Sequence, residues 1–202
     1  MSESLPHERH LEIVREADGV IVTTDYLAKQ YRPYNPNVFV CPNQIDPADW
    51  AEPVKPDDGV FRIGWFASRS HRADMGLIAR GLEWASRQPD VEIVLVGAGV
   101  SADGKPWYPF RFKFVPWSND FGVYRKALAE LDVGLAPVVG TPWAVCRSDL
   151  KILEYAMSGA VTVVSDQPPY ESWDDGEYCL KAKTARDFLR AIQHLVAHRD
   201  EA

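Results

Sequence analysis

Residues 148–166 read SDLKILEYAMSGAVTVVSD, and this stretch joins a helix, its stop signal and a buried strand. The opening Ser-Asp pair is typical of a helix start. Ser158-Gly159 is a small-residue stop, and the apolar residues 161–164 predict a buried strand. A helix that runs through a short turn into a buried strand is typical of α/β proteins with a parallel sheet.

Lys151 and Glu154 lie three residues apart, so on a helix they share one face close to its first turn. The first turn carries free backbone N–H groups and the positive end of the helix dipole, which together favour phosphate. Lys151 adds a mobile cation, and a carboxylate at Glu154 accepts hydrogen bonds from a ribose diol. The pair therefore predicts a nucleoside-diphosphate site. The alternative is an amphipathic helix whose Lys and Glu only face water.

Strand and helix patterns alternate through residues 56–202. Strands are expected where apolar residues cluster, at residues 61–67, 91–97, 112–115, 133–137 and 161–165. Helices are expected at residues 75–88, 121–130, 185–199 and in the stretch that begins at Ser148. This alternation predicts an α/β fold, a Rossmann-like parallel sheet with helices on both faces.

Residues 1–50 form a second, shorter unit by pattern. A strand is expected at residues 19–24, a helix at 25–31 and a second strand at 38–41. The sequence DWAEPVKPDDG at residues 49–59 has the prolines and the closing turn of a linker. We therefore expect a strand–helix–strand unit within residues 1–50 and a Rossmann-like domain at residues 56–202.

Composition excludes several classes of protein. The 202 residues suffice for one well-packed core, and a net charge of −7 argues against a general nucleic-acid binder. The apolar runs are strand-sized and no signal peptide follows Met1, so no transmembrane segment is expected. Cys41, Cys146 and Cys179 are odd in number and widely spaced, which favours reduced thiols in a cytoplasmic protein.

The helix that begins at Ser148 resembles the donor-site helix of the family 4 glycosyltransferases, retaining enzymes with the GT-B fold. The shared motif is S-x-x-K-x-x-E-Y followed by a small-residue-Gly turn. Other stretches match the family in the same order, namely ADGVIVTTDYLAKQY, NVFVCPNQID, RIGWFASRSHRADM, PDVEIVLVG, VPW and LAELDVGLAPV. The resemblance spans residues 10–195, almost the whole chain.

A GT-B enzyme has two Rossmann-like domains that face each other across a cleft. The resemblance implies that residues 56–202 are the nucleotide-sugar-binding donor domain, and that residues 1–50 are a remnant of the acceptor domain with the interdomain connection. The rest of the acceptor domain is then missing, so the chain is a shortened protein, half of a split enzyme or a fragment. Met1-Ser2-Glu3 is typical of a natural start. We expect a homodimer or a separate acceptor-domain partner, bound through residues 1–50.

The resemblance also assigns the loop that follows the strand at residues 61–67. In the family this loop approaches the sugar diphosphate, with small residues for close approach and cations for the phosphates. The residues implied in this chain are Gly64, Ser68, Arg69, His71 and Arg72. The loop lacks the commoner Gly-Arg and Lys-Gly pairs of the family, and the alternative is a polar loop whose basic residues face solvent.

Two more segments complete the implied site. The loop beside the nucleobase is Val115, Pro116 and Trp117, with the Trp ring as a stacking face; the alternative is a strand end with a buried Trp. The helix start that faces the phosphates is Ser148, Asp149 and Leu150. This chain departs from the family's E-x7-E motif at the first position, where it has Cys146 in place of glutamate. Glu154 matches the second glutamate, which binds ribose in the family.

The sequence therefore predicts a glycosyltransferase of the hexosyltransferase type, or its donor-binding half. It would transfer sugar from a nucleoside-diphosphate sugar with retention, without a metal or another cofactor, using Lys151 and the arginines at 69 and 72 as catalytic cations. The alternative is a catalytically inactive nucleotide-sugar-binding or assembly module that works through a partner chain or a homodimer. An epimerase of the same fold is a third possibility.

Two other patterns are interpreted as structural. VLVGAGVSA imitates a dinucleotide fingerprint, but the turn-forming DGKP that follows takes the place of the helix that such a site needs. His194 and His198 lie four apart on the terminal helix, where no third metal ligand is evident, so they are expected to be solvated.

Overall fold

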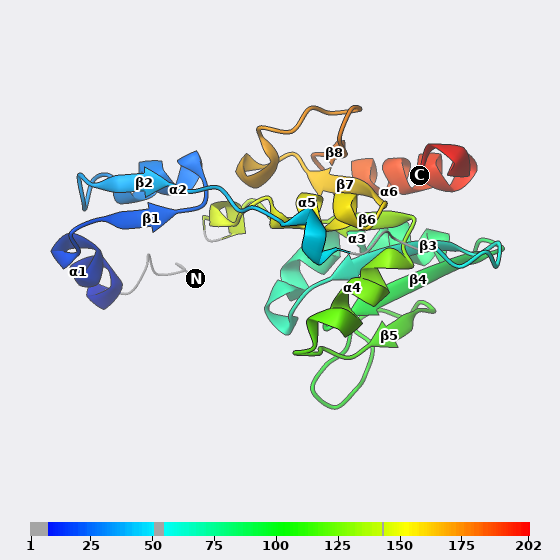
Figure 1. The fold of residues 1–202 in the computed structure, drawn as a ribbon. Helices are drawn as coiled ribbons and strands as arrows, with labels where there is room; N and C mark the ends of the chain where they lie inside the picture. Colours follow the sequence, from blue (N-terminus) through cyan, green and yellow to red (C-terminus); the bar gives the residue numbers. More distant parts are fainter. Residues whose placement is uncertain (1–7, 51–54, 143) are drawn as a thin grey trace.

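The computed structural model describes residues 8–50, 55–142 and 144–202. A six-stranded parallel sheet with helices on both faces forms the larger part of the molecule, and a two-stranded parallel sheet forms the smaller part (Figure 1). The predicted α/β, Rossmann-like class is confirmed. None of the described helices has the length and apolar character needed to cross a bilayer.

The larger sheet has the strand order β5-β4-β3-β6-β7-β8, and each neighbouring pair is parallel. Its strands are β3 (Phe61–Phe66), β4 (Val91–Val96), β5 (Lys113–Val115), β6 (Val133–Ala136), β7 (Val161–Ser165) and β8 (Leu180–Ala182). Numbered within this sheet, the order is 3-2-1-4-5-6, that of doubly wound nucleotide-binding folds. The order reverses between β3 and β6, so the carboxyl ends of these two strands border a crevice.

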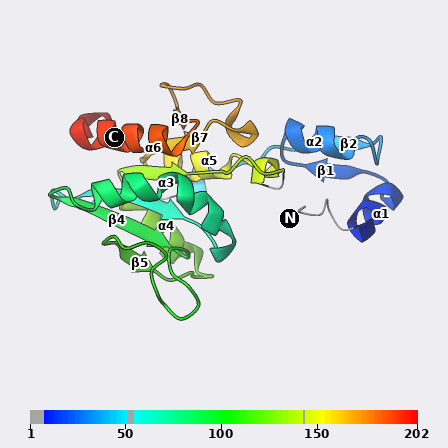
Figure 2. The same cartoon turned by 180° about the vertical axis from the view of Figure 1, so that it is seen from behind.

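Two pairs of helices cover the two faces of this sheet. Helices α3 (Arg72–Ala85) and α6 (Ala185–Ala197) pack on one face around Ile63, Leu95 and Leu135. Helices α4 (Phe121–Ala129) and α5 (Leu150–Met157) cover the other face. Gly134 of β6 lets α5 approach closely, since a Cβ there would stand 2.3 Å from the Tyr155 ring. In Figure 1 the viewer sees α4 in front of the sheet, and in Figure 2 α3.

The smaller sheet pairs β1 (Val20–Val22) with β2 (Val38–Val40). Two helices, α1 (Glu8–Glu16) and α2 (Asp25–Tyr31), accompany it, and the hydroxyl of Thr24 caps α2 by accepting from the Leu27 N–H. The buried Asn35 ties the unit together because its amide donates to the carbonyls at the end of α1, both at 2.8 Å. This unit, residues 8–40, stands beside the larger one in both views (Figures 1 and 2).

The structure differs from the expected elements in a few places. Helix α3 covers residues 72–85, where residues 75–88 were expected, because a short turn at residues 69–71 leads directly into it. Helix α1 and strand β8 were not predicted. The expected linker at residues 49–59 includes residues 51–54, which lie outside the described residues. Short 3-10 turns complete the fold: η1 (Pro47–Asp49), η2 (Arg69–His71), η3 (Ala144–Cys146), η4 (Pro168–Tyr170) and η5 (Arg199–Glu201).

Candidate functional site

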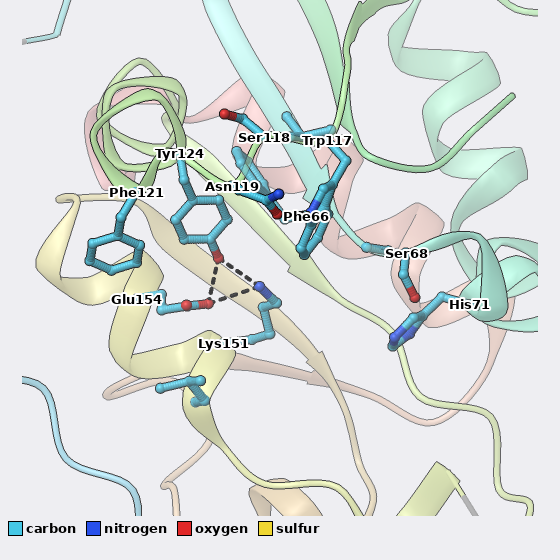
Figure 3. A pocket seen from close by; sticks show the side chains of 13 residues that line it. Phe66, Ser68, His71, Trp117, Ser118, Asn119, Phe121, Tyr124, Lys151 and Glu154 are labelled. Atoms are coloured by element: carbon cyan, nitrogen blue, oxygen red, sulfur yellow. Dashed lines mark hydrogen bonds and ion pairs between the residues drawn. The ribbon is translucent and has the colours of Figure 1, made fainter. Parts of the chain in front are cut away.

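A cavity of about 500 Å³ opens at the carboxyl edge of the larger sheet, beside the point where the strand order reverses (Figure 3). Its walls come from the ends of β3 and β4, the loop after β5, and helices α4 and α5. The lining residues are Phe66, Ala67, Ser68, His71, Val96, Trp117, Ser118, Asn119, Phe121, Tyr124, Leu150, Lys151 and Glu154. Doubly wound sheets bind their ligands at this position.

Lys151, Glu154 and Tyr124 form a closed triangle of hydrogen bonds on the wall of this cavity (Figure 3). The Lys151 ammonium donates to Glu154 Oε2 and to the Tyr124 hydroxyl, each at 2.8 Å. The Tyr124 hydroxyl in turn donates to Glu154 Oε2 at 2.7 Å. Oε2 therefore receives two donors, and hydrogen-bonding capacity remains at the other carboxylate oxygen, Oε1.

The triangle is set in an aromatic wall. The Phe66 ring meets the Tyr124 ring edge-on, with 5.2 Å between their centroids. The Lys151 ammonium lies 5.9 Å from the Phe66 centroid and 5.3 Å from that of Tyr124, within cation–π range. Burial, together with the negative charge of Glu154, raises the pKa of Tyr124 far above its ordinary value. The Tyr124 hydroxyl is therefore a neutral donor across the physiological pH range.

Trp117 stands at the rim of the cavity with 64% of its surface exposed. Its indole N–H points to Asn119 Oδ1 at 3.4 Å, and its ring packs over Gly97. A Cβ at Gly97 would stand 2.9 Å from the ring and 2.6 Å from the Ala67 carbonyl, and the φ angle there is +74°. Gly97 therefore allows Trp117 to lie against the sheet edge with one ring face open to a ligand.

A second cavity, of about 360 Å³, adjoins the first. Phe66, His71, Leu150 and Lys151 line both, so the two form one groove along the carboxyl edge. The second cavity is closed by the ends of β3 and β6 and by Arg147, Ser148 and Tyr170.

The predicted site residues divide into three groups by position. Those that line the first cavity are Ser68, His71, Trp117, Leu150, Lys151 and Glu154. Ser148 lines the second cavity. Those absent from both sets of lining residues are Gly64, Arg69, Arg72, Val115, Pro116 and Asp149.

The residues outside the groove have identifiable neighbours. Gly64 lies inside β3, where a Cβ would stand 2.3 Å from the Leu131 side chain, so its small size serves packing. The Arg72 guanidinium lies 5.7 Å from the Trp107 ring centroid. Asp149 accepts the indole N–H of Trp173 at 3.1 Å, which holds the start of α5. Arg69 is exposed in the turn before α3.

Several lining residues were not predicted: Ser118, Asn119, Phe121 and Tyr124. Asp120 caps α4 by accepting from the N–H groups of Gly122 and Val123, and this cap places Tyr124 at the end of the first turn of the helix. The Asp cap is visible in the sequence. Nothing in the sequence links Tyr124 to a lysine 27 residues further on.

The structure adds a third polar neighbour to the two histidines of the terminal helix, which are exposed as expected. No third ligand was evident for His194 and His198, yet the structure brings Glu201 close, and one ligand atom from each lies within 4.8 Å of the others. The turn η5 folds the chain back after α6 and places Glu201 Oε2 2.8 Å from His194 Nε2. All three side chains are exposed, and they lie at the end of α6 and in η5, which do not line the groove.

No protein-family model and no curated protein matches this chain. Solved structures do match it. Anabaena Alr3699/HepE in complex with UDP-glucose aligns with a TM-score of 0.71 and 14% identity, over 95% of this chain and 58% of that one. S. aureus TarM aligns with a TM-score of 0.65 and 15% identity, over 94% of this chain and 39% of that one. The trehalose-6-phosphate synthase OtsA aligns with a TM-score of 0.65 and 13% identity, over 94% of this chain and 53% of that one.

At these identities the likeness shows the fold, a Rossmann-like α/β fold shared with GT-B glycosyltransferase structures. The chain spans between 39% and 58% of the length of these three neighbours.

Proposed function

We propose that the chain binds a nucleoside-diphosphate sugar in the groove and serves glycosyl transfer. The observation that carries this proposal is the triangle of Lys151, Glu154 and Tyr124 at the switch point of the sheet. Lys151 supplies the cation for a phosphate, and Glu154 Oε1 accepts from the ribose hydroxyls. Trp117 offers a face for the base. Neighbours of the same fold were solved with UDP-glucose and with UDP, which supports this choice of ligand.

Retention of configuration and independence from metal are part of the proposal. Lys151 and the start of α5, whose Leu150 lines the groove, supply positive charge where a diphosphate would leave, so the chain's own groups stabilise the leaving group. Arg69, on the exposed turn before α3, is the second cation of this proposal. Arg72, which stacks on Trp107, would have to leave that ring to join it.

The division into a donor domain at residues 56–202 and an acceptor-domain remnant at residues 1–50 is also proposed. The separate two-stranded sheet supports it, as does the partial coverage of the neighbours. Ile21 and Phe39 pair in register on that sheet and are 75% and 61% exposed, so they form an apolar face for a homodimer or an acceptor-domain partner. The three free cysteines support a cytoplasmic location.

The test is calorimetric titration of the chain with UDP, GDP, ADP and TDP and their common sugar conjugates. We expect micromolar binding of one base series, weakened at least ten-fold in Lys151→Ala. Lys113→Ala is a matched control, because Lys113 also pairs with a glutamate, Glu130, but lies outside the groove. A folded chain that binds no member of the panel would contradict the proposal.

A second candidate is a nucleotide-sugar-binding module without catalysis. Cys146 favours it, since a thiol stands where the family has its first glutamate. The Cys146 thiol donates to the Pro142 carbonyl at 3.0 Å, and burial raises its pKa, so it remains neutral. The two candidates differ in turnover: an enzyme releases free nucleoside diphosphate when acceptor or partner is supplied, and a module binds the donor without consuming it.

A further inference from the structure

The groove has a second polar centre, next to the triangle, around the buried Asp74. Asp74 lies in the first turn of α3 and is 1% exposed. Its Oδ2 accepts from Arg147 Nη1 at 2.6 Å and lies 2.9 Å from His71 Nδ1, while Oδ1 accepts the Val139 N–H at 2.9 Å. Both oxygens of the carboxylate therefore have hydrogen-bond partners, and the Arg147 guanidinium is held through its Nη1.

We propose that Arg147, held by Asp74, binds an oxyanion of the ligand at the end of the groove away from Trp117. The inference rests on the proposed function and assigns a contact that the triangle does not make. Two sources offer this chemistry: the distal phosphate of a nucleoside diphosphate, and the carboxylate of a uronic acid carried as the sugar.

The first support is the unused hydrogen-bonding capacity of Arg147. A guanidinium has five N–H donors in a rigid fork. The bond to Asp74 is the one side-chain interaction recorded for Arg147 among the described residues, and it uses Nη1. The side chain remains 26% exposed and lines the second cavity, so donors of the fork remain for a bound group.

The second support is the sign of the charge in the second cavity. Among the described residues that line it, none is Asp or Glu, whereas Arg147 and Lys151 are cations and His71 adds a ring nitrogen. Asp74 itself is covered. Although burial alone would raise the pKa of Asp74, the hydrogen bonds from His71, Arg147 and Val139 lower it, so the carboxylate is charged and satisfied. Asp74 and Glu154 pair with the two cations from outside this lining, so the groups that the cavity wall itself presents are hydrogen-bond donors suited to an anion.

The third support is the order of contacts along the groove. The first cavity holds Trp117 and Glu154, and Lys151 belongs to both cavities. Arg147 belongs only to the second. If the base of a nucleotide lies at Trp117 and its ribose at Glu154, its first phosphate lies beside Lys151. The group that reaches Arg147 is then the next one along the ligand.

Asp74 acts as a positioning residue in this arrangement. Burying a carboxylate costs free energy, and an ion pair of this kind contributes little net stability compared with an apolar pair. Its clear effect is to hold one end of a flexible arginine. The fork then binds with less loss of side-chain freedom.

The experiment compares ligands that differ by one oxyanion. Each ligand is titrated into the wild-type chain and into Arg147→Gln. The uridine series is UMP, UDP, UDP-glucose and UDP-glucuronate, and the guanosine series is GMP, GDP, GDP-mannose and GDP-mannuronate. For the other two bases, AMP is compared with ADP and TMP with TDP. Arg87→Gln is the control, because Arg87 is an exposed arginine beyond the end of α3, 72% exposed and paired with Glu83.

The result expected for a phosphate contact is at least a ten-fold loss of diphosphate affinity in Arg147→Gln, with monophosphate affinity unchanged. The result expected for a uronate contact is the same loss for UDP-glucuronate or GDP-mannuronate alone. Unchanged affinity for every ligand in a folded Arg147→Gln chain would overturn the inference. Failure of the wild-type chain to bind any nucleotide would instead overturn the proposed function, and this inference with it.

Two further variants separate positioning from folding. Asp74→Asn should reproduce the selective loss while monophosphate affinity stays unchanged, which a general loss of structure would not do. If Arg147→Gln unfolds, the double variant Asp74→Asn/Arg147→Gln removes both charges and provides a folded chain for the same titrations. Wild-type diphosphate selectivity in Asp74→Asn would reject the role of Asp74.

Discussion

The two sheets of this chain bury their apolar residues to very different degrees. Strands β3 and β6 of the larger sheet carry Ile63 and Leu135, both 0% exposed between two layers of helices. On the smaller sheet Ile21 and Phe39 are 75% and 61% exposed. A two-stranded sheet is marginal by itself, whereas a six-stranded sheet covered on both faces has a core of its own. The comparison implies that the larger unit supplies most of the folding stability, and that the smaller unit presents an apolar surface to a partner.

The largest expected effect is therefore in the larger sheet. Leu135→Ala removes a fully buried side chain from the middle of β6 and should lower the free energy of unfolding by about 2–5 kcal/mol. Urea unfolding followed by circular dichroism measures it. Val123→Ala, at a position 46% exposed on α4, is the control and should change stability by less than about 0.5 kcal/mol. Equal effects in the two variants would break the comparison.

The second effect concerns binding. Glu154→Gln keeps an oxygen that accepts from the Tyr124 hydroxyl but removes the charge that pairs with Lys151. Nucleotide affinity should fall by about 1–3 kcal/mol, the range of a charge-assisted hydrogen bond. Calorimetric titration with the nucleotide of the preferred base measures it. Wild-type affinity in this variant would show that the ribose does not lie against Glu154.

A smaller effect is expected at Tyr124. Tyr124→Phe keeps the ring that packs on Phe66 but removes the hydroxyl that bridges Lys151 and Glu154. Affinity should fall by about 1 kcal/mol, because the two charged groups remain but lose their shared partner. Tyr178→Phe, at an exposed tyrosine outside the groove, is the matched control. A loss equal to that of Glu154→Gln would mean that the hydroxyl contacts the ligand itself.

Much of the larger unit could be predicted because its signals are local. The strand at Val161–Ser165 was expected at residues 161–165, and the helix at Phe121–Ala129 at residues 121–130. The helix start at residue 72 was missed because no side chain caps it: His71 is the N-cap, and its side chain pairs with Asp74 and accepts no hydrogen bond from a backbone N–H of the first turn. Strand β8, Leu180–Ala182, has three residues and one neighbouring strand, too little for a pattern.

The candidate site was only partly predictable for a related reason. Lys151 and Glu154 are neighbours on one helix, so their spacing in the sequence indicates their contact. Asp74 and Arg147 are 73 residues apart, and only the pairing of β3 with β6 brings the elements that follow these strands together. Sequence patterns do not encode such contacts between distant segments. Such contacts also decide the conformation of Arg72, whose guanidinium lies over the Trp107 ring.

The smallest effect on stability, and the sharpest test of the comparison, is in the smaller sheet. Ile21→Ser and Phe39→Ser remove apolar side chains that already face solvent, so the free energy of unfolding of the monomer should change by less than about 0.5 kcal/mol. The same variants should abolish self-association, because the two residues are opposite each other in the β1–β2 register and form one patch. Light scattering at micromolar concentration measures the change.

This last prediction depends on what covers the patch. If the wild-type chain is a dimer and Phe39→Ser is a monomer of unchanged stability, the smaller sheet is an interface between copies. A wild-type monomer at micromolar concentration would contradict the homodimer and leave an acceptor-domain partner as the remaining proposed occupant. A large loss of stability in Phe39→Ser would mean instead that the side chain is buried in solution. The contrast between the two sheets would then fail.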